Sequence, residues 1–154
     1  MNVAPNFSLK STAQQVVTLD TLLHNKLFLV LYFYPRNDTP GCTKESIDFK
    51  DYYKIFSALS TEIVGVSNDN LTSSMNFQKK YDLPFQLLSD HDQKVVKEYD
   101  VLKEKKMFNN KFLGIERSTF LISKEHNIIR EWRKVRVPNH VKNILKTLEE
   151  ISHV

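Results

Sequence analysis

The sequence predicts an α/β fold whose sheet has parallel strands at its centre and antiparallel strands at its edge. Two observations predict it. Apolar, β-prone runs alternate with segments of helical periodicity through residues 27–99, and two short β runs joined by a polar turn follow them. The 154 residues have the length of one ordinary domain and show no repeat, low-complexity tract or linker. We therefore expect a single domain over residues 1–154.

The first predicted strand covers residues 27–33, a continuous apolar and aromatic run that is typical of a strand buried on both faces of a sheet. Pro35 ends this run, and the Asn, Asp, Pro and Gly residues of segment 37–41 are typical of a turn. Apolar residues then recur with the i, i+3, i+4, i+7 spacing of one helix face, which predicts a helix over residues 43–59.

The later elements follow from the same two periodicities and from their flanking residues. We expect strands at 62–67 and 85–88, helices at 71–81, 90–99 and 139–151, and a hairpin made of strands 117–123 and 128–133.

The composition restricts the class of protein. The only cysteine, Cys42, excludes an internal disulfide and any zinc site built from several cysteines. The longest apolar run, residues 27–34, is far shorter than the ~20 residues that a membrane span requires. Residues 1–10 lack the pattern of a signal peptide. We therefore expect a cytoplasmic protein without a membrane partner.

The formal net charge of +4 is uneven, because residues 101–154 carry 12 Lys or Arg against 6 Asp or Glu. A nucleic-acid partner is one interpretation of this basic region. We favour a solvated lysine-rich surface, because acidic and apolar residues are interspersed and no nucleic-acid-binding motif accompanies them.

Cys42 lies where the predicted turn meets the predicted helix, directly after Gly41. The free N–H groups of a helix start favour a thiolate there. They contribute at most about 2 kcal/mol, so a mostly ionised thiol needs a second cation, and arginine suits that role. A buried cysteine that only fills space is the alternative. The Pro-Gly turn and the hydroxyl three residues earlier, on Thr39, argue against it.

Pro35, Thr39 and Cys42 have the spacing of the active-site signature of the peroxiredoxins, which this chain resembles. The string from Phe33 to Thr43 is similar to the bacterioferritin comigratory protein, or Q-type, branch of that family. Segments 4–9, 87–90 and 114–122 resemble further landmarks of the family in order and spacing.

The resemblance implies a thioredoxin-like fold, with a central mixed sheet, helices on both faces and an N-terminal β extension. It implies a thiol-dependent peroxidase that reduces hydrogen peroxide and organic hydroperoxides without a metal or organic cofactor. The reaction would pass through a cysteine sulfenic acid.

The same resemblance assigns roles to individual residues. Cys42 matches the peroxidatic cysteine, Thr39 the hydroxyl that hydrogen-bonds thiolate and peroxide, and Pro35 the proline that shields the pocket from water. Arg117 matches the arginine that pairs with thiolate and peroxide, although an ordinary ion pair at a strand edge is its alternative. Supporting positions are Gly41 and Glu45. Glu45 either orients an arginine or is simply a first-turn glutamate favoured by the helix dipole.

One position departs from the family. Many Q-type members have a resolving cysteine five residues after the peroxidatic one, where this chain has Ile47. The sulfenic acid must therefore react with an external thiol, from thioredoxin, a glutaredoxin-like protein, a small thiol or a second copy of the chain. We expect a monomer or a weak homodimer.

The histidines lack the spacing of a metal site, and we interpret them as isolated or hydrogen-bonded side chains. They are His24, His91, His126, His140 and His153. A cysteine hydrolase would need a histidine base beside Cys42. The sequence leaves His126 and His140 open for that role and supports neither. The alternative to a peroxidase is a non-catalytic thioredoxin-fold module that acts as a redox sensor or an interaction surface.

Overall fold

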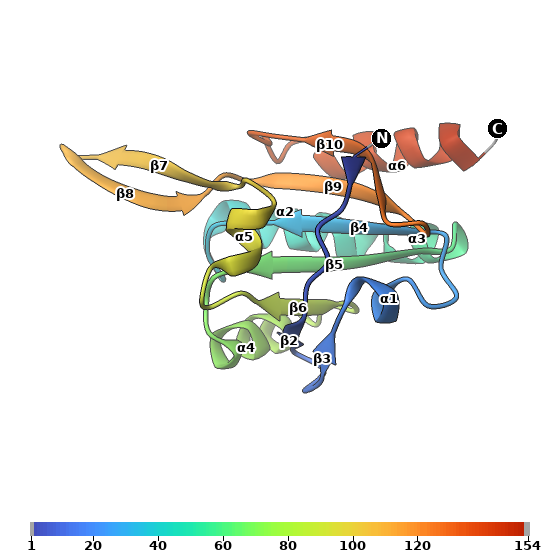
Figure 1. Cartoon of the computed structure of the whole chain (residues 1–154), viewed down its shortest axis with the longest axis horizontal. Coiled ribbons are helices and arrows are strands. Elements are labelled where there is room, and N and C mark those ends of the chain that lie inside the picture. The colour runs from blue at the N-terminus through green and yellow to red at the C-terminus, as the bar shows by residue number, and fades with distance from the viewer. Residues whose placement is uncertain (1, 153–154) are drawn as a thin grey trace.

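The fold is built on a mixed sheet of eight strands (Figure 1), in a computed structural model whose described residues are 2–152. The sheet has the order β1-β10-β9-β4-β5-β6-β2-β3, and β7 and β8 form a separate two-stranded sheet. The strands are β1 Asn2–Val3, β2 Leu9–Ser11, β3 Val16–Val17, β4 Phe28–Phe33, β5 Thr61–Ser67, β6 Gln86–Ser89, β7 Leu102–Met107, β8 Asn110–Ile115, β9 Ser118–Ser123 and β10 Asn127–Trp132.

The centre of the sheet is parallel and its edges are antiparallel, which confirms the predicted arrangement. β4 pairs in parallel with β5, and β5 with β6. On the other side, β9 pairs antiparallel with both β4 and β10, so the predicted hairpin is present. The N-terminal segment supplies both edges, since β1 pairs with β10 at one edge and β3 pairs with β2, which pairs with β6, at the other.

Helices cover both faces of the sheet. They are α1 Leu19–Leu22, α2 Pro40–Asp51, α3 Tyr53–Ala58, α4 Leu71–Tyr81, α5 Lys94–Glu98 and α6 His140–Ser152. Successive side chains of β4 point to opposite faces. Leu31 and Phe33 join the apolar cluster under α1 and α5, whereas Val30 and Tyr32 join the cluster under α2, α3, α4 and α6. None of the helices within residues 2–152 has the length and apolar content needed to span a membrane.

Two helix predictions were wrong in their extent. The segment predicted as one helix over 43–59 begins at Pro40 and breaks at Tyr52, whose backbone has φ −103° and ψ 6°. The helix predicted over 90–99 is confined to Lys94–Glu98. Gln93 has a left-handed backbone (φ 64°), and the Asp90 side chain accepts a hydrogen bond from the Val96 N–H at 2.8 Å. Residues 90–93 therefore form a turn that the side chain of Asp90 ties to α5.

The β7–β8 hairpin was not predicted. It projects from the body of the molecule (Figure 1), and the Phe108 side chain at its tip is 92% exposed. Its strands contain several lysines and few buried residues, so they lack the apolar runs that identified the central strands.

Candidate active site

The start of α2 is set by the residues that precede Cys42. Pro40 occupies the first helical position, where its missing N–H removes no hydrogen bond. Proline also favours an extended backbone in the residue before it, and Thr39 has φ −97° and ψ 155°. Cys42 therefore lies in the first turn of the helix. The N–H groups of that turn have no partner within the helix and place positive partial charge near the sulfur.

The loop before α2 is fixed to the neighbouring helix α4. Asn37 accepts a hydrogen bond from the Tyr34 hydroxyl at 2.6 Å, and its side-chain amide donates to the hydroxyls of Ser73 and Ser74 at 3.1 and 3.0 Å. Asp38 pairs with Lys80 at 2.8 Å. These contacts fix the middle of the loop to α4, so the position of Cys42 depends on α4 as well as on α2.

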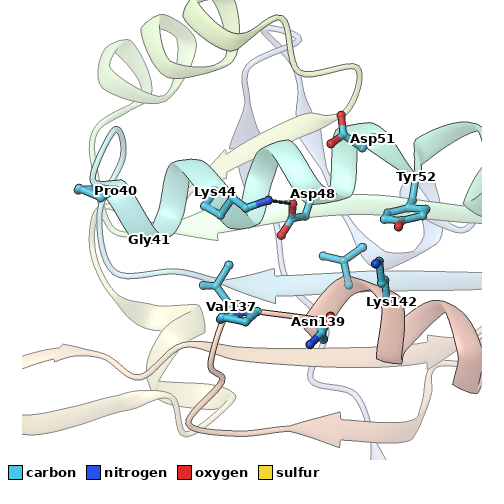
Figure 2. Close-up of a pocket in the computed structure, with 11 residues that line it drawn as sticks. Pro40, Gly41, Lys44, Asp48, Asp51, Tyr52, Val137, Asn139 and Lys142 are labelled. Carbon is cyan, nitrogen blue, oxygen red and sulfur yellow. Dashed lines mark hydrogen bonds and ion pairs between the residues drawn. The ribbon is translucent and has the colours of Figure 1, made fainter.

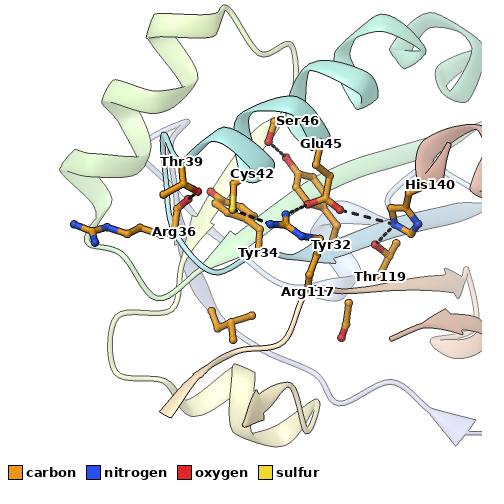
Figure 3. Close-up of polar contacts among 12 residues, drawn as sticks. Tyr32, Tyr34, Arg36, Thr39, Cys42, Glu45, Ser46, Arg117, Thr119 and His140 are labelled. Carbon is orange, nitrogen blue, oxygen red and sulfur yellow. Dashed lines mark hydrogen bonds and ion pairs between the residues drawn. The ribbon is translucent and has the colours of Figure 1, made fainter. Parts of the chain in front are cut away.

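Arg117 is the residue directly before β9, and its guanidinium points toward the Cys42 sulfur (Figure 3). Its Nη2 lies 3.4 Å from Cys42 Sγ, and its Nη1 donates to Glu45 Oε1 at 2.7 Å. Cys42 is 1% exposed and Glu45 is fully buried. The structure thus brings together three of the residues that the sequence singled out, one of them 75 positions from Cys42 in the chain.

The charges of this group influence one another strongly. Burial raises the pKa of Glu45 to about 7, although the positive charge of Arg117 and its hydrogen bond act in the opposite direction. Burial also lowers the pKa of Arg117, but the charges of Glu45 and Cys42 outweigh it, so the net pKa is raised. Arg117 is therefore a permanent cation beside the sulfur, whereas Glu45 can change its charge near neutral pH.

Two further buried residues extend this group toward α6, and sequence reasoning did not place them in the site. His140 Nε2 lies 2.9 Å from Thr119 Oγ1 and 3.8 Å from Glu45 Oε2 (Figure 3). His140 precedes Ile144 and Leu148 by four and eight residues, which puts it on the apolar face of α6. That spacing was the available signal for a buried histidine.

The other predicted site residues lie in the loop before α2 and at the start of that helix. The Thr39 hydroxyl donates to the Arg36 carbonyl at 2.9 Å, which leaves its oxygen able to accept a hydrogen bond. Pro35 is half-buried at the start of the loop. A Cβ at Gly41 would lie 3.1 Å from Arg117 Nη2, so a residue without a side chain lets the guanidinium approach the helix start closely.

A surface groove of about 570 Å³ runs between α2 and the start of α6 (Figure 2). Gly41, Lys44, Asp48, Asn139 and Lys142 are among its lining residues. The groove begins next to Cys42 but does not include it, so the sulfur is enclosed in this conformation. Ile47 lines a separate hollow with Tyr81 of α4, on another side of α2.

A buried cysteine at a helix start, paired with an arginine on a thioredoxin-like sheet, defines a thiol-dependent redox enzyme. Comparison with known proteins is specific about the family. Residues 1–131 match the AhpC/TSA family. Peroxiredoxin Bcp of Bacillus subtilis (strain 168) is 45% identical over 149 residues, which cover 97% of this chain and 94% of that protein. The chain therefore belongs to the AhpC/TSA family, as a one-cysteine peroxiredoxin of the bacterioferritin comigratory protein, or Q-type, branch.

Solved structures agree with this assignment. Peroxiredoxin Q of Xanthomonas campestris is 40% identical and superimposes with a TM-score of 0.88, over 95% of this chain and 91% of that one. A peroxiredoxin Q variant from Xylella fastidiosa is 36% identical with a TM-score of 0.90, over 99% and 98% of the two chains. The thioredoxin-like fold and the class of thiol-dependent peroxidase are thereby confirmed, and the non-catalytic alternative is not favoured.

Proposed function

We propose that Cys42 is the peroxidatic cysteine of this peroxiredoxin, within a single domain that spans residues 1–154. The observation that supports it best is the position of Arg117, which Glu45 holds at 2.7 Å and whose Nη2 lies 3.4 Å from Sγ. A guanidinium stays charged when it is partly buried, and its planar fork can contact two atoms at once. It can therefore stabilise the thiolate and then the negative charge that develops on the peroxide oxygens.

In the first step the Cys42 thiolate attacks one peroxide oxygen, a new S–O bond forms and the O–O bond breaks. The departing oxygen takes up a proton and leaves as water or an alcohol, and the cysteine becomes a sulfenic acid. In the second step an external thiolate attacks the sulfur, an S–S bond forms and the S–O bond breaks, and the departing hydroxide takes up a proton to leave as water. A second external thiol then attacks the external sulfur of this mixed disulfide, which releases the reduced cysteine and joins the two external thiols in a disulfide.

The residues around the sulfur have supporting roles in this proposal. The Thr39 oxygen accepts a hydrogen bond from the peroxide, and Pro35 shields the sulfur from water. Glu45 orients Arg117, and Gly41 leaves room for it, since a Cβ there would lie 3.1 Å from Nη2. Of these, Thr39 acts on the substrate and Pro35 limits the access of water to the sulfur, whereas Glu45 and Gly41 act through Arg117.

The substrates and partners are proposed on the same basis. The bacterioferritin comigratory protein of Xanthomonas campestris, 39% identical with a TM-score of 0.88, has alkyl peroxide reduction activity. We infer that this chain reduces hydrogen peroxide and organic hydroperoxides. Because Cys42 is the only cysteine, the reductant is an external thiol, from thioredoxin, a glutaredoxin-like protein or a small thiol. We expect a monomer or weak homodimer in the cytoplasm.

Stopped-flow mixing with hydrogen peroxide tests the role of Cys42. We expect the wild-type sulfur to react far faster than free cysteine, and the Cys42→Ser variant not to react. Thioredoxin, glutaredoxin and a small thiol are then supplied in turn. Continuous peroxide consumption with one of them supports the peroxidase. A single oxidation without turnover in all three would indicate a sensor instead, and a wild-type rate equal to that of free cysteine would refute the proposal.

A further inference from the structure

His140 is a buried polar residue that faces the active site from α6. Its side chain is held in place by its neighbours, since its ring lies edge-on to Trp132 and Phe49, with centroids 6.2 and 6.5 Å away. Its Nε2 is 2.9 Å from Thr119 Oγ1 and 3.8 Å from Glu45 Oε2. The imidazole therefore points one nitrogen at both a hydroxyl and a carboxylate.

One carboxylate oxygen of Glu45 accepts a hydrogen bond, and the other has no partner within the described part of the chain. Oε1 accepts from Arg117, whereas Oε2 is buried and has no hydrogen-bond partner among residues 2–152. An unpartnered buried carboxylate oxygen is unfavourable when the group is ionised. His140 Nε2 is close enough to become its partner through a small side-chain movement, because 3.8 Å is slightly beyond hydrogen-bond distance.

We propose that His140 is a positioning residue for the peroxidase reaction, whose Nε2–H donates to Glu45 Oε2 when Glu45 is ionised. This proposal rests on the proposed function of Cys42. The hydrogen bond holds the Glu45 carboxylate against Arg117, and Arg117 in turn lies against the sulfur. Thr119 Oγ1 is the competing acceptor for the same N–H group. No proton is transferred in this arrangement.

The electrostatics of the site agree with a neutral donor. Burial and the charge of Arg117 lower the pKa of His140 to about 4, so near neutral pH it can stabilise Glu45 only by hydrogen bonding. The titratable groups around Glu45 come from four parts of the fold. Cys42 and Asp48 lie on α2, and His140 lies on α6. Tyr32 lies on β4, Tyr34 follows β4, and Arg117 precedes β9. Arg117 is the one cation among them.

Two substitutions should move the titration of Glu45 in opposite directions. His140→Leu removes the donor to the carboxylate, which raises the pKa of Glu45 by about one unit. Thr119→Val removes the competing acceptor and leaves Glu45 as the acceptor for the N–H, which lowers that pKa. A loss of packing has no reason to produce opposite shifts.

The Glu45 titration is followed by the ¹³C chemical shift of its side-chain carboxyl carbon, a measurement that does not depend on activity. The rate of Cys42 oxidation by hydrogen peroxide is measured over pH 5.5 to 9 on the same variants. We expect His140→Leu to slow oxidation about tenfold at pH 7. His140→Gln, which keeps a side-chain N–H donor, should restore most of that rate. His24→Gln, at an exposed position, is the matched control and should leave rate and titration unchanged.

The Glu45→Gln background separates positioning from packing. There, His140→Leu should cause no further slowing, because the carboxylate that it acts through is absent. An equal slowing in both backgrounds, or upward shifts of the titration in both His140→Leu and Thr119→Val, would overturn the proposal. If His140→Leu fails to fold, Thr119→Val and His140→Gln still decide it. If wild-type Cys42 reacts no faster than free cysteine, the proposed function fails, whereas the carboxyl titration still reports on His140.

Discussion

Burial and Arg117 act in opposite directions on the pKa of Glu45, and a measurement of stability against pH decides which effect is larger. Full burial opposes the charged form of Glu45, and the guanidinium 2.7 Å away favours it. Burial is the larger effect and raises the pKa of Glu45 from an ordinary value of 4.5 to about 7. We therefore predict that replacing Glu45 by Gln, which cannot ionise, changes how the free energy of unfolding depends on pH.

The sign follows from linkage. Because the pKa of Glu45 is higher in the folded chain than in the unfolded chain, the folded chain binds the proton more tightly. This contribution to stability is fully present below pH 4.5 and is lost as the pH rises through about 7. At about 1.36 kcal/mol per pH unit, the difference in unfolding free energy between the chain with Glu45 and the Glu45→Gln variant should change by about 2.5 kcal/mol between pH 5 and 8. The chain that keeps Glu45 is the one that loses stability.

Urea denaturation followed by the fluorescence of Trp132 measures this difference at pH 5, 6, 7 and 8. Both chains should carry Cys42→Ser, so that the thiol does not contribute to the pH dependence. Glu125→Gln, at an exposed position, is the control, and its effect should not vary over this range. A Glu45→Gln effect that is constant from pH 5 to 8 would refute the reasoning. It would mean that Arg117 outweighs burial and keeps Glu45 ionised throughout.

Three other substitutions test the site and its support. Arg117→Lys keeps the charge but loses the planar fork, and should slow the reaction with hydrogen peroxide by about 10- to 100-fold in stopped flow; Arg130→Lys, at an exposed position, should not. Gly65→Ala places a Cβ 2.6 Å from Tyr32 Cζ and should destabilise the chain by about 1–3 kcal/mol in urea denaturation, and an unchanged midpoint would show that the ring moves freely. Ile47→Cys puts a second thiol on α2, five residues after Cys42. The axial rise between these two positions, about 7.5 Å, exceeds the Cα separation that a disulfide allows, roughly 4.4–6.8 Å, so the helix has to unwind before the disulfide can form. Mass spectrometry should show its disulfide forming more slowly than the sulfenic acid, and equal rates would mean that α2 is already unwound.

The central sheet was predictable because its strands are buried on both faces. β4 is a continuous run of apolar residues, and β5 has a buried apolar centre at Ile63, Val64 and Val66. The break at Tyr52 was not predictable, since the apolar spacing continues through it and α3 packs on the same apolar cluster as α2. The β7–β8 hairpin was missed for the opposite reason, because its exposed strands bury too little to leave a pattern.

The candidate site likewise contains residues that the sequence could identify and residues that it could not. Thr39 and Cys42 lie within one turn of the chain, so their spacing alone marks them. Arg117 is 75 residues from Cys42, and only the family resemblance identified it. His140 was visible as a histidine on an apolar helix face, but its distance to Glu45 depends on how α6 packs against α2. No local pattern encodes that packing.

The two chemical steps place different demands on α2. Cys42 is 1% exposed, so we expect that the proposed reduction by a protein thiol requires the first turn of the helix to open. The middle of the helix is anchored, because the Ser46 and Tyr32 hydroxyls are 2.9 Å apart and Phe49 stacks on the Tyr32 ring at 4.5 Å. We therefore expect any opening to be limited to the residues before Ser46, and such an opening would move the sulfur away from Arg117. Under the proposed mechanism, we expect peroxide to be attacked in the closed conformation, where Arg117 lies 3.4 Å from the sulfur, and a protein thiol to act on an open one. With Ile47 in place of a second cysteine, nothing in this chain requires α2 to unwind further than that.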